Sequence, residues 1–281
     1  MSNAVAVCHG AFGRAALYRL DREIITHAHR EGHLIFSVGG EDAVAIIDEE
    51  PVPVTPTTAA AVSPWQLHRY KVPEGGVSLC LVLYIKPIWF LENSRSAEYA
   101  LQFGSNKLVL TEDTVKLVRR LVSIILAEEE RSDFNEVLYD VTATCFNLTW
   151  RDSCRSTLLH EARRRFSDFR VRRSLQLMRD NLSADIAMEG LAREVGLSRP
   201  HFFKLFKKHV GVSPNIYLNT LRTEHAIEVL TGTDKTVTEI AYDLGFSSQA
   251  SFTRFFSSNV GIAPSEYRRV AIDANASFAM V

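Results

Sequence analysis

The sequence predicts an α+β fold in two domains: an N-terminal β-barrel, a helical region after it, and a C-terminal all-α domain with two helix-turn-helix motifs. Three observations support this prediction. Short strand-like runs fill the first part of the 281-residue chain, two long amphipathic patterns follow, and a helix–glycine–helix pattern occurs twice near the end. A chain of this length is expected to hold about two domains. We place the boundaries at residues 1–90, 91–160 and 161–281.

Strand-like runs alternate with turn residues between about Arg14 and Lys86. The runs are HLIFSV, DAVAIID, AAAVSP and VSLCLVLYI, and Gly39-Gly40, Pro51-Val52-Pro53 and Gly75-Gly76 separate them. Aliphatic and β-branched runs that end at Gly and Pro are typical of strands and turns. The spacing of these runs predicts a small β-barrel or sandwich.

Helices are expected after the strands, starting near Trp89. One amphipathic pattern has apolar residues at Val115, Leu117, Val118, Leu121, Val122, Ile124 and Ile125, and a second has them at Phe134, Val137, Leu138, Val141, Cys145 and Leu148. Both follow the helical period. The first face is broad enough either to pack on the β domain or to contact a second subunit, so residues 91–160 are a predicted linker and dimerisation region.

The C-terminal part of the chain contains an internal repeat. The segment LAREVGLSRPHFFKLFKKHVGVSPNIY (residues 191–217) aligns with IAYDLGFSSQASFTRFFSSNVGIAPSEY (residues 240–267), with one inserted residue just after the glycine. Each copy has an apolar helical face, a glycine that ends the helix, and a second helix with a phenylalanine stripe. A helix, a short turn with Gly and a second helix form the helix-turn-helix pattern. We place the two units at about residues 186–208 and 236–258.

Local signals mark the ends of these helices. Gly196 and Gly245 break the first helix of each copy, and Ser198, and then Ser247 or Ser248, are expected to cap the second. Pro200 falls in the first turn, where its missing N–H is tolerated. Between the two copies, a helix is expected to begin at Pro214 and to end near Gly232.

Charge differs between the two halves of the chain. Residues 1–154 carry 14 Lys and Arg against 20 Asp and Glu, whereas residues 155–269 carry 18 against 12. A basic second half indicates a polyanionic partner, and a solvated charged surface is the alternative.

These features resemble the AraC/XylS family of bacterial transcription regulators over residues 168–270. The motifs that carry the resemblance are both glycine turns, the Phe-rich second helices, GVSPNIY and GFSSQASFTRFF…VGIAPSEYR. The resemblance implies seven helices, two helix-turn-helix units joined by a long helix, and one monomer bound to two adjacent major-groove segments of promoter double-stranded DNA. It also implies a homodimer, a small-molecule effector and RNA polymerase as further partners.

Side chains that could read DNA lie on the exposed side of each second helix. They are Arg199, Pro200, Phe203, Lys204 and Lys207 in the first copy, and Gln249, Ala250, Thr253 and Arg254 in the second. Arg and Lys pair with guanine, Gln with adenine, and apolar groups with the thymine methyl. Phe203 could equally pack within the domain, and Lys207 could bind phosphate.

Four histidines gather in the predicted β domain: His27, His29, His33 and His68. The run HAHREGH resembles the first motif of the cupin family, except that His33 replaces a Glu, and SPWQLH resembles a degenerate second motif with Trp65 where a glycine is common. The resemblance implies a cupin-like domain whose four positions hold a divalent metal, for which zinc, iron or nickel suit neutral imidazoles. The alternative is that these histidines line an effector pocket without a metal.

No catalytic motif stands out in the chain, which lacks GxxxxGK[ST], HExxH and GxSxG. The competing hypothesis is a metal-dependent cupin enzyme fused to a DNA-binding domain. A catalyst needs no groove-reading module, so we expect a transcription regulator and not an enzyme. The sequence also shows no membrane-spanning run or signal peptide, and its cysteines, Cys8, Cys80, Cys145 and Cys154, form no CxxC pair. This usage favours the cytoplasm.

Overall fold

The structure is a computed structural model that describes residues 2–87, 89–90, 102–127, 133–150, 168–182 and 187–273. Cys154 and the predicted domain boundaries at residues 91 and 160–161 lie outside these residues. No helix among the described residues is long and apolar enough to span a membrane.

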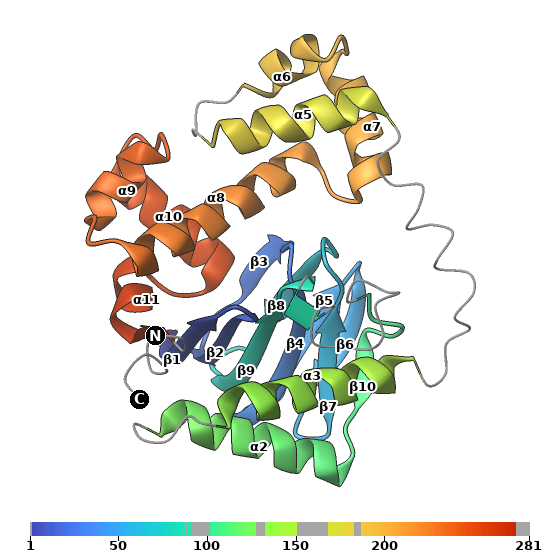
Figure 1. Ribbon diagram of the computed structural model, residues 1–281, viewed down its shortest axis with the longest axis vertical. Helices are drawn as coiled ribbons and strands as arrows, with labels where there is room; N and C mark the ends of the chain where they lie inside the picture. The colour runs from blue at the N-terminus through green and yellow to red at the C-terminus, as the bar shows by residue number, and fades with distance from the viewer. Residues whose placement is uncertain are drawn as a thin grey trace.

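The described strands, all but β10 and β11 from the first 85 residues, form two sheets that pack as an open sandwich (Figure 1). The strands are β1 Asn3–Gly10, β2 Gly13–Leu20, β3 Ile24–His27, β4 Gly32–Gly40, β5 Ala43–Ile47, β6 Glu50–Val54, β7 Thr58–Val62, β8 His68–Lys71, β9 Ser78–Ile85, β10 Lys107–Val109 and β11 Ala271–Asp273. One sheet has the order β10-β7-β4-β9-β2-β1-β11 and the other β3-β8-β5-β6. The β-rich domain is therefore confirmed, but the described strands do not close into a barrel.

The central strands of the large sheet are buried on both faces, which explains why they are continuously apolar. In β4, Leu34 and Phe36 face one hydrophobic cluster while Ile35 faces another. Successive side chains on a strand point to opposite faces, so each face receives every second residue. The same alternation separates Val82 from Leu81 in β9.

Two helices cover one face of the large sheet: α2 Glu112–Leu126 and α3 Phe134–Thr149. On α2, Val118, Leu121 and Ile125 are buried in the cluster that includes Leu34 and Phe36. Core packing therefore accounts for the centre of the apolar face on α2. Leu117, Val122 and Ile124 are only partly buried at its margins.

Seven helices are described in the C-terminal part of the chain, the number that the family resemblance implies. They are α5 Phe169–Asp180, α6 Met188–Glu194, α7 Arg199–Val210, α8 Pro214–Gly232, α9 Val237–Asp243, α10 Gln249–Val260 and α11 Pro264–Val270. In Figure 1, α8 runs between one group formed by α5, α6 and α7 and another formed by α9, α10 and α11. The expected bounds of the long helix are confirmed.

The C-terminal helices pack on the face of the sandwich away from α2 and α3 (Figure 1). The chain returns to the β domain after α11, where β11 pairs in parallel with β1. The Tyr267 hydroxyl lies 3.2 Å from His9 Nε2 across the same boundary. Buried residues of α8, α9, α10 and α11 share one hydrophobic cluster with both sheets, so the two domains have a common core.

Candidate nucleic-acid interface and histidine cluster

The two helix-turn-helix units have the same turn. Gly196 has a φ of +71° and Gly245 a φ of +74°, in the left-handed region that favours glycine. The amide after each glycine donates a hydrogen bond to the carbonyl five residues earlier, from Leu197 to Ala192 and from Phe246 to Ala241, both at 2.9 Å. The repeat in the sequence is therefore a repeat in the backbone.

The second helix of each unit, α7 or α10, is fixed by its phenylalanine stripe. Phe202 and Phe206 are buried in the first unit, and Phe252 and Phe256 in the second. Ser248 occupies the cap position of α10, where its side chain accepts a hydrogen bond from the Ser251 amide. On α7, Ser198 occupies the cap position as predicted, but its side chain makes no capping hydrogen bond.

The side chains proposed to read DNA lie mainly on the opposite side of these helices. Those exposed are Arg199, Pro200, Lys204 and Lys207 on α7, and Gln249, Ala250 and Arg254 on α10; Phe203 and Thr253 are partly buried. The buried phenylalanines thus orient an exposed polar surface on each helix.

Some of these side chains already have partners in the chain. The Arg199 guanidinium lies 5.2 Å from the centre of the Phe203 ring, and its Nε lies 3.5 Å from Glu189. Phe203 packs beside the core of the first unit, which supports the packing alternative for this residue. The Thr238 hydroxyl and the Gln249 side-chain oxygen are 2.7 Å apart, which fixes the orientation of that amide.

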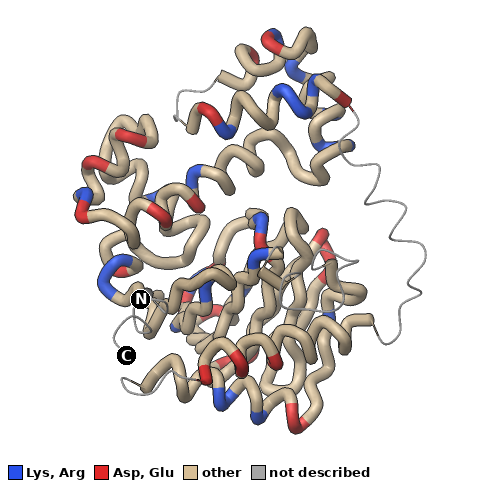
Figure 2. Tube along the Cα trace, in the orientation of Figure 1, with Lys and Arg blue, Asp and Glu red and all other residues tan. Residues whose placement is uncertain are grey.

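The two exposed surfaces differ in charge. Besides Arg199, α7 carries Lys204, Lys207 and Lys208, whereas α10 carries Arg254 as its one Lys or Arg. Figure 2 shows basic and acidic positions interspersed along the C-terminal helices. The first unit therefore offers the stronger attraction for phosphate, and the second depends more on polar contacts.

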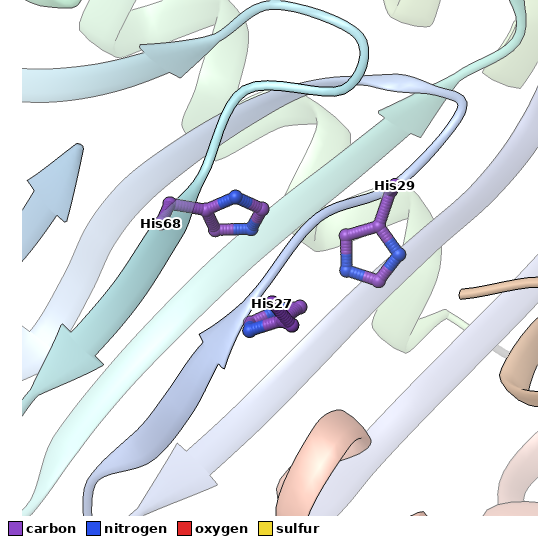
Figure 3. Close-up of side chains that lie close together, drawn as sticks. All are labelled: His27, His29 and His68. Carbon is purple, nitrogen blue, oxygen red and sulfur yellow. The ribbon is translucent and has the colours of Figure 1, made fainter. Parts of the chain in front are cut away.

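The four histidines predicted to lie together do so. His27 ends β3 and pairs directly with His68, the first residue of β8, while His29 follows β3 and His33 lies on β4 (Figure 3 shows His27, His29 and His68). Ring centroids are 4.3 Å apart for His27 and His68, 4.7 Å for His27 and His29, and 4.4 Å for His29 and His33. All four side chains are buried.

Hydrogen bonds fix two of these rings. His27 Nδ1 lies 2.6 Å from the Ile25 carbonyl oxygen, and His68 Nδ1 lies 2.9 Å from that of Gln66. A carbonyl accepts only, so each Nδ1 carries the proton and each Nε2 keeps a lone pair. Within the described part of the chain, neither ring nitrogen of His29 has a hydrogen-bond partner.

Burial keeps these rings neutral. It is the main cause that lowers the pKa of all four histidines, to about 4 for His68. Positive charge on the neighbouring rings and on Arg14 lowers the pKa of His29 and His33 further. Four uncharged imidazoles therefore occupy one buried site at neutral pH.

The loop that carries His29 is bound to α8. The Thr220 hydroxyl donates to the Ala28 carbonyl at 2.8 Å, and Arg30 forms an ion pair with Glu224. Neither contact could be expected from the sequence, because polar residues on α8 have the pattern of a solvated helix face.

Trp65 makes a further contact between the domains. Its ring stacks on Tyr217 with centroids 4.8 Å apart, and its amide donates to the His29 carbonyl at 2.7 Å. Trp65 has a φ of +65°, in the region that favours glycine. Such strain persists where surrounding contacts fix it, here the stacking on α8. The cupin motif commonly has a glycine at this position, and this was the sign in the sequence that the backbone takes a left-handed conformation here.

A cavity of about 810 Å³ lies between the β domain and the C-terminal helices. Its walls include Arg14 and Glu31 from the β domain, and Glu224 and Arg268 from the helices, but not the four histidines. Arg14 Nε, Glu31 Oε2 and Arg268 Nη2 have no hydrogen-bond partner among the described residues. This cavity was not expected from the sequence, since its residues come from separate segments.

Comparison with known proteins connects the repeat to a family. A family model described as a helix-turn-helix domain matches residues 191–270. The chain is 25% identical over 263 residues to the HTH-type transcriptional activator RhaS of Enterobacter sp. (strain 638), covering 89% of this chain and 90% of RhaS. It is 32% identical over 98 residues to the lactose operon transcription activator of Staphylococcus xylosus, covering 35% of each.

Other relatives are longer or more distant. An uncharacterised HTH-type transcriptional regulator of Staphylococcus aureus (strain COL) is 28% identical over 214 residues, which cover 74% of this chain; the chain spans only 28% of that relative's length. The structure of ToxT from Vibrio cholerae, with an unsaturated fatty acid bound, matches with a TM-score of 0.53 and 15% identity over 95% of this chain and 96% of ToxT. At this identity, the likeness concerns the two-domain fold.

Proposed function

We propose that this chain belongs to the AraC/XylS family of helix-turn-helix transcription regulators, that it binds promoter double-stranded DNA, and that it responds to a small molecule through its β domain. The observation that carries the proposal is the pair of helix-turn-helix units with matching glycine turns and exposed second helices. Similarity to RhaS over almost the whole chain supports the same function.

Helix α8 sets the spacing of the two units. It is continuous from Pro214 to Gly232 and joins them directly. Major-groove segments on one side of B-DNA recur about 34 Å apart. We therefore assign α7 and α10 to two successive major-groove segments on one face of the duplex.

The exposed residues divide into two roles. Lys204 and Arg254 lie near the middle of their helices and are assigned to base edges, where Arg and Lys recognise guanine. Lys207 and Arg199 are assigned to phosphates, which position the protein without reading sequence. Gln249 is assigned to adenine, because its amide is already oriented by Thr238.

The interdomain cavity is the proposed effector site. Orphan guanidinium N–H groups of Arg14 and Arg268 and an orphan carboxylate oxygen of Glu31 belong to residues that line it. Buried polar groups are nearly always paired, so a ligand with both acceptor and donor groups suits this site. A polar organic anion that also carries a hydroxyl or amino group meets that requirement. Binding of such a ligand would change how the β domain packs against the C-terminal helices.

A homodimer and contact with RNA polymerase are part of the proposal. The partly buried margins of α2, Leu117 and Ile124, and the 51% exposed Leu126 offer apolar surface to a second copy. A homodimer would place two pairs of reading helices on one promoter, which raises affinity without a new kind of contact.

Catalysis is the weaker hypothesis. The matched relatives with assigned roles are transcription regulators, which supports regulation over a cupin enzyme.

The test is selection of bound duplexes from a random pool by the purified full chain, followed by sequencing. We expect two short enriched sequence blocks whose centres are about one helical turn apart. A pool that stays random after repeated selection at physiological salt would overturn the proposal. A single enriched block would mean that only one of the two helix-turn-helix units reads bases.

A further inference from the structure

Three buried histidines, from β3, the segment that follows it and β8, converge in the β domain. One nitrogen from each of His27, His29 and His68 lies within 4.8 Å of the others (Figure 3). His29 is only 4% exposed, and neither of its ring nitrogens has a hydrogen-bond partner among the residues that the structure describes. A buried polar group without a hydrogen bond is unfavourable, and a metal ion that accepts a lone pair from each ring would satisfy the nitrogens that face one another here.

We propose that His27, His29 and His68 bind a divalent transition-metal ion of the zinc class and that its binding acts on the position of α8. Neutral imidazole is a good ligand for zinc and neighbouring first-row metals. Three protein ligands would leave the fourth tetrahedral position for water or for an anionic group.

The hydrogen bonds of the cluster suit metal binding. A histidine that binds a metal commonly donates its other ring N–H to a carbonyl or carboxylate, which fixes the ring and its tautomer. His27 and His68 already donate from Nδ1 to the carbonyls of Ile25 and Gln66. Their Nε2 atoms therefore keep the lone pairs that a metal needs.

The spacing requires only a small adjustment. With Zn–N distances near 2.0–2.1 Å, tetrahedral ligand nitrogens are about 3.3 Å apart. The observed nitrogens lie within 4.8 Å of one another, so no pair would need to close by more than about 1.5 Å when a metal binds. His29 is the ring best able to move, because no hydrogen bond from a described residue holds its side chain.

Movement of His29 would reach the DNA-binding domain directly. Ala28 and Arg30 flank His29, and they contact Thr220 and Glu224 on α8. This part of the inference rests on the proposed function, because it takes α8 as the element that spaces the two reading helices. The metal would thus act on the position of α8 relative to the β domain through one short segment of backbone.

The first experiment measures metal in the full chain without DNA. The protein is stripped with a chelator, loaded with zinc alone and dialysed, and its metal content is determined by mass spectrometry. We expect about one equivalent per chain, lost in His29→Ala and kept in His225→Ala, a matched variant at a histidine whose side chain is 46% exposed on α8. No retention by the wild type, or equal retention by His29→Ala, overturns the site.

A second measurement keeps this test decisive if His29→Ala fails to fold. Wild-type protein loaded with cobalt(II) should show the visible absorption of a low-symmetry nitrogen site, displaced by one equivalent of zinc. Zinc should also raise the thermal midpoint of the wild type, because a ligand that binds only the native state stabilises it. Absence of both signals overturns the site.

The coupling is tested by DNA affinity with and without zinc. We expect about a 10-fold change in the wild type, within the usual range for linked sites. Thr220→Val should keep zinc but lose most of this change, whereas Thr231→Val, which removes a hydroxyl bonded within α8, should keep both. Unchanged affinity in zinc-loaded wild type overturns the coupling alone. Failure to bind any DNA would count against the proposed function and leave the metal result standing.

Discussion

Arg30, in the loop between β3 and β4, forms an ion pair with Glu224 on α8, the helix that joins the two helix-turn-helix units. The backbone amide of Arg30 also donates to Glu224 at 3.4 Å. The Glu224 side chain is 8% exposed and that of Arg30 is 49% exposed. The ion pair therefore holds α8 against the loop between β3 and β4, while the Arg30 guanidinium remains accessible to solvent.

Loss of the cation should destabilise the protein. Arg30→Ala leaves a buried carboxyl without its partner, and we expect a loss of about 1–3 kcal/mol in the free energy of unfolding. The control is Arg69→Ala, which breaks the more exposed pair with Glu23 and should change stability by less than about 1 kcal/mol. Urea unfolding of both variants provides the comparison, and equal losses would remove any special role for the Arg30 pair.

The same pair should make stability depend on pH. Burial, with the charge of Glu31 as a second cause, raises the pKa of Glu224 to about 7 although Arg30 opposes the rise. The native state then holds a proton that the unfolded chain releases near its ordinary pKa of about 4.3. Stability from this group is present at low pH and is lost as pH rises from about 4 through about 7. Glu224→Gln should flatten that slope in denaturant titrations; an unchanged slope would assign it to other groups.

Specificity should depend on one residue in each reading helix. Lys204→Ala and Arg254→Ala should each cost about 1–3 kcal/mol on the best site and relax preference at separate positions. Fluorescence anisotropy on selected and random duplexes measures both effects, with Arg120→Ala on α2 as the control. Equal losses of affinity on selected and random duplexes would show that Lys204 and Arg254 contact phosphates and do not read bases.

The glycine of the first turn should be required for its backbone conformation alone. Gly196 has a φ of +71°, and a Cβ there would meet nothing within 4 Å. Gly196→Ala should therefore destabilise by about 1 kcal/mol through strain. Gly190→Ala, inside helix α6, should instead stabilise by about 0.5–1 kcal/mol. Thermal unfolding that gave both changes the same sign would contradict this explanation.

The apolar face of α2 can be divided between core and surface by two substitutions. Val118 is 4% exposed, so Val118→Glu should unfold the β domain. Leu126 is 51% exposed, so Leu126→Glu should fold normally and, if α2 pairs two subunits, sediment as a monomer. A monomeric wild type at micromolar concentration would remove the dimer from the proposal.

The sequence predicted the C-terminal domain well because its signals are local. Proline, glycine and a phenylalanine stripe set the bounds of α8 and of both helix-turn-helix units within a few residues. The strands around Leu34 and Leu81 could also be predicted from a local signal, since burial on both faces makes their sequences continuously apolar.

Other features depend on contacts between distant segments, which no local pattern reveals. The parallel pairing of β11 with β1 joins the two ends of the described chain. The bond from Thr220 to Ala28 also could not be predicted, because a threonine on α8 has the same pattern whether it faces solvent or another domain. The histidine cluster was predicted from motif resemblance; its geometry, with His27 opposite His68 and His29 beyond the strand, required the fold.

Two-site binding by a single chain is tested most directly by a hydroxyl-radical footprint of the wild-type protein on its selected duplex. The fold predicts two protected segments on one face of the DNA, with centres about 10–10.5 base pairs apart, because α8 holds α7 and α10 at a fixed separation. One protected segment per chain, or two on opposite faces of the duplex, would contradict it.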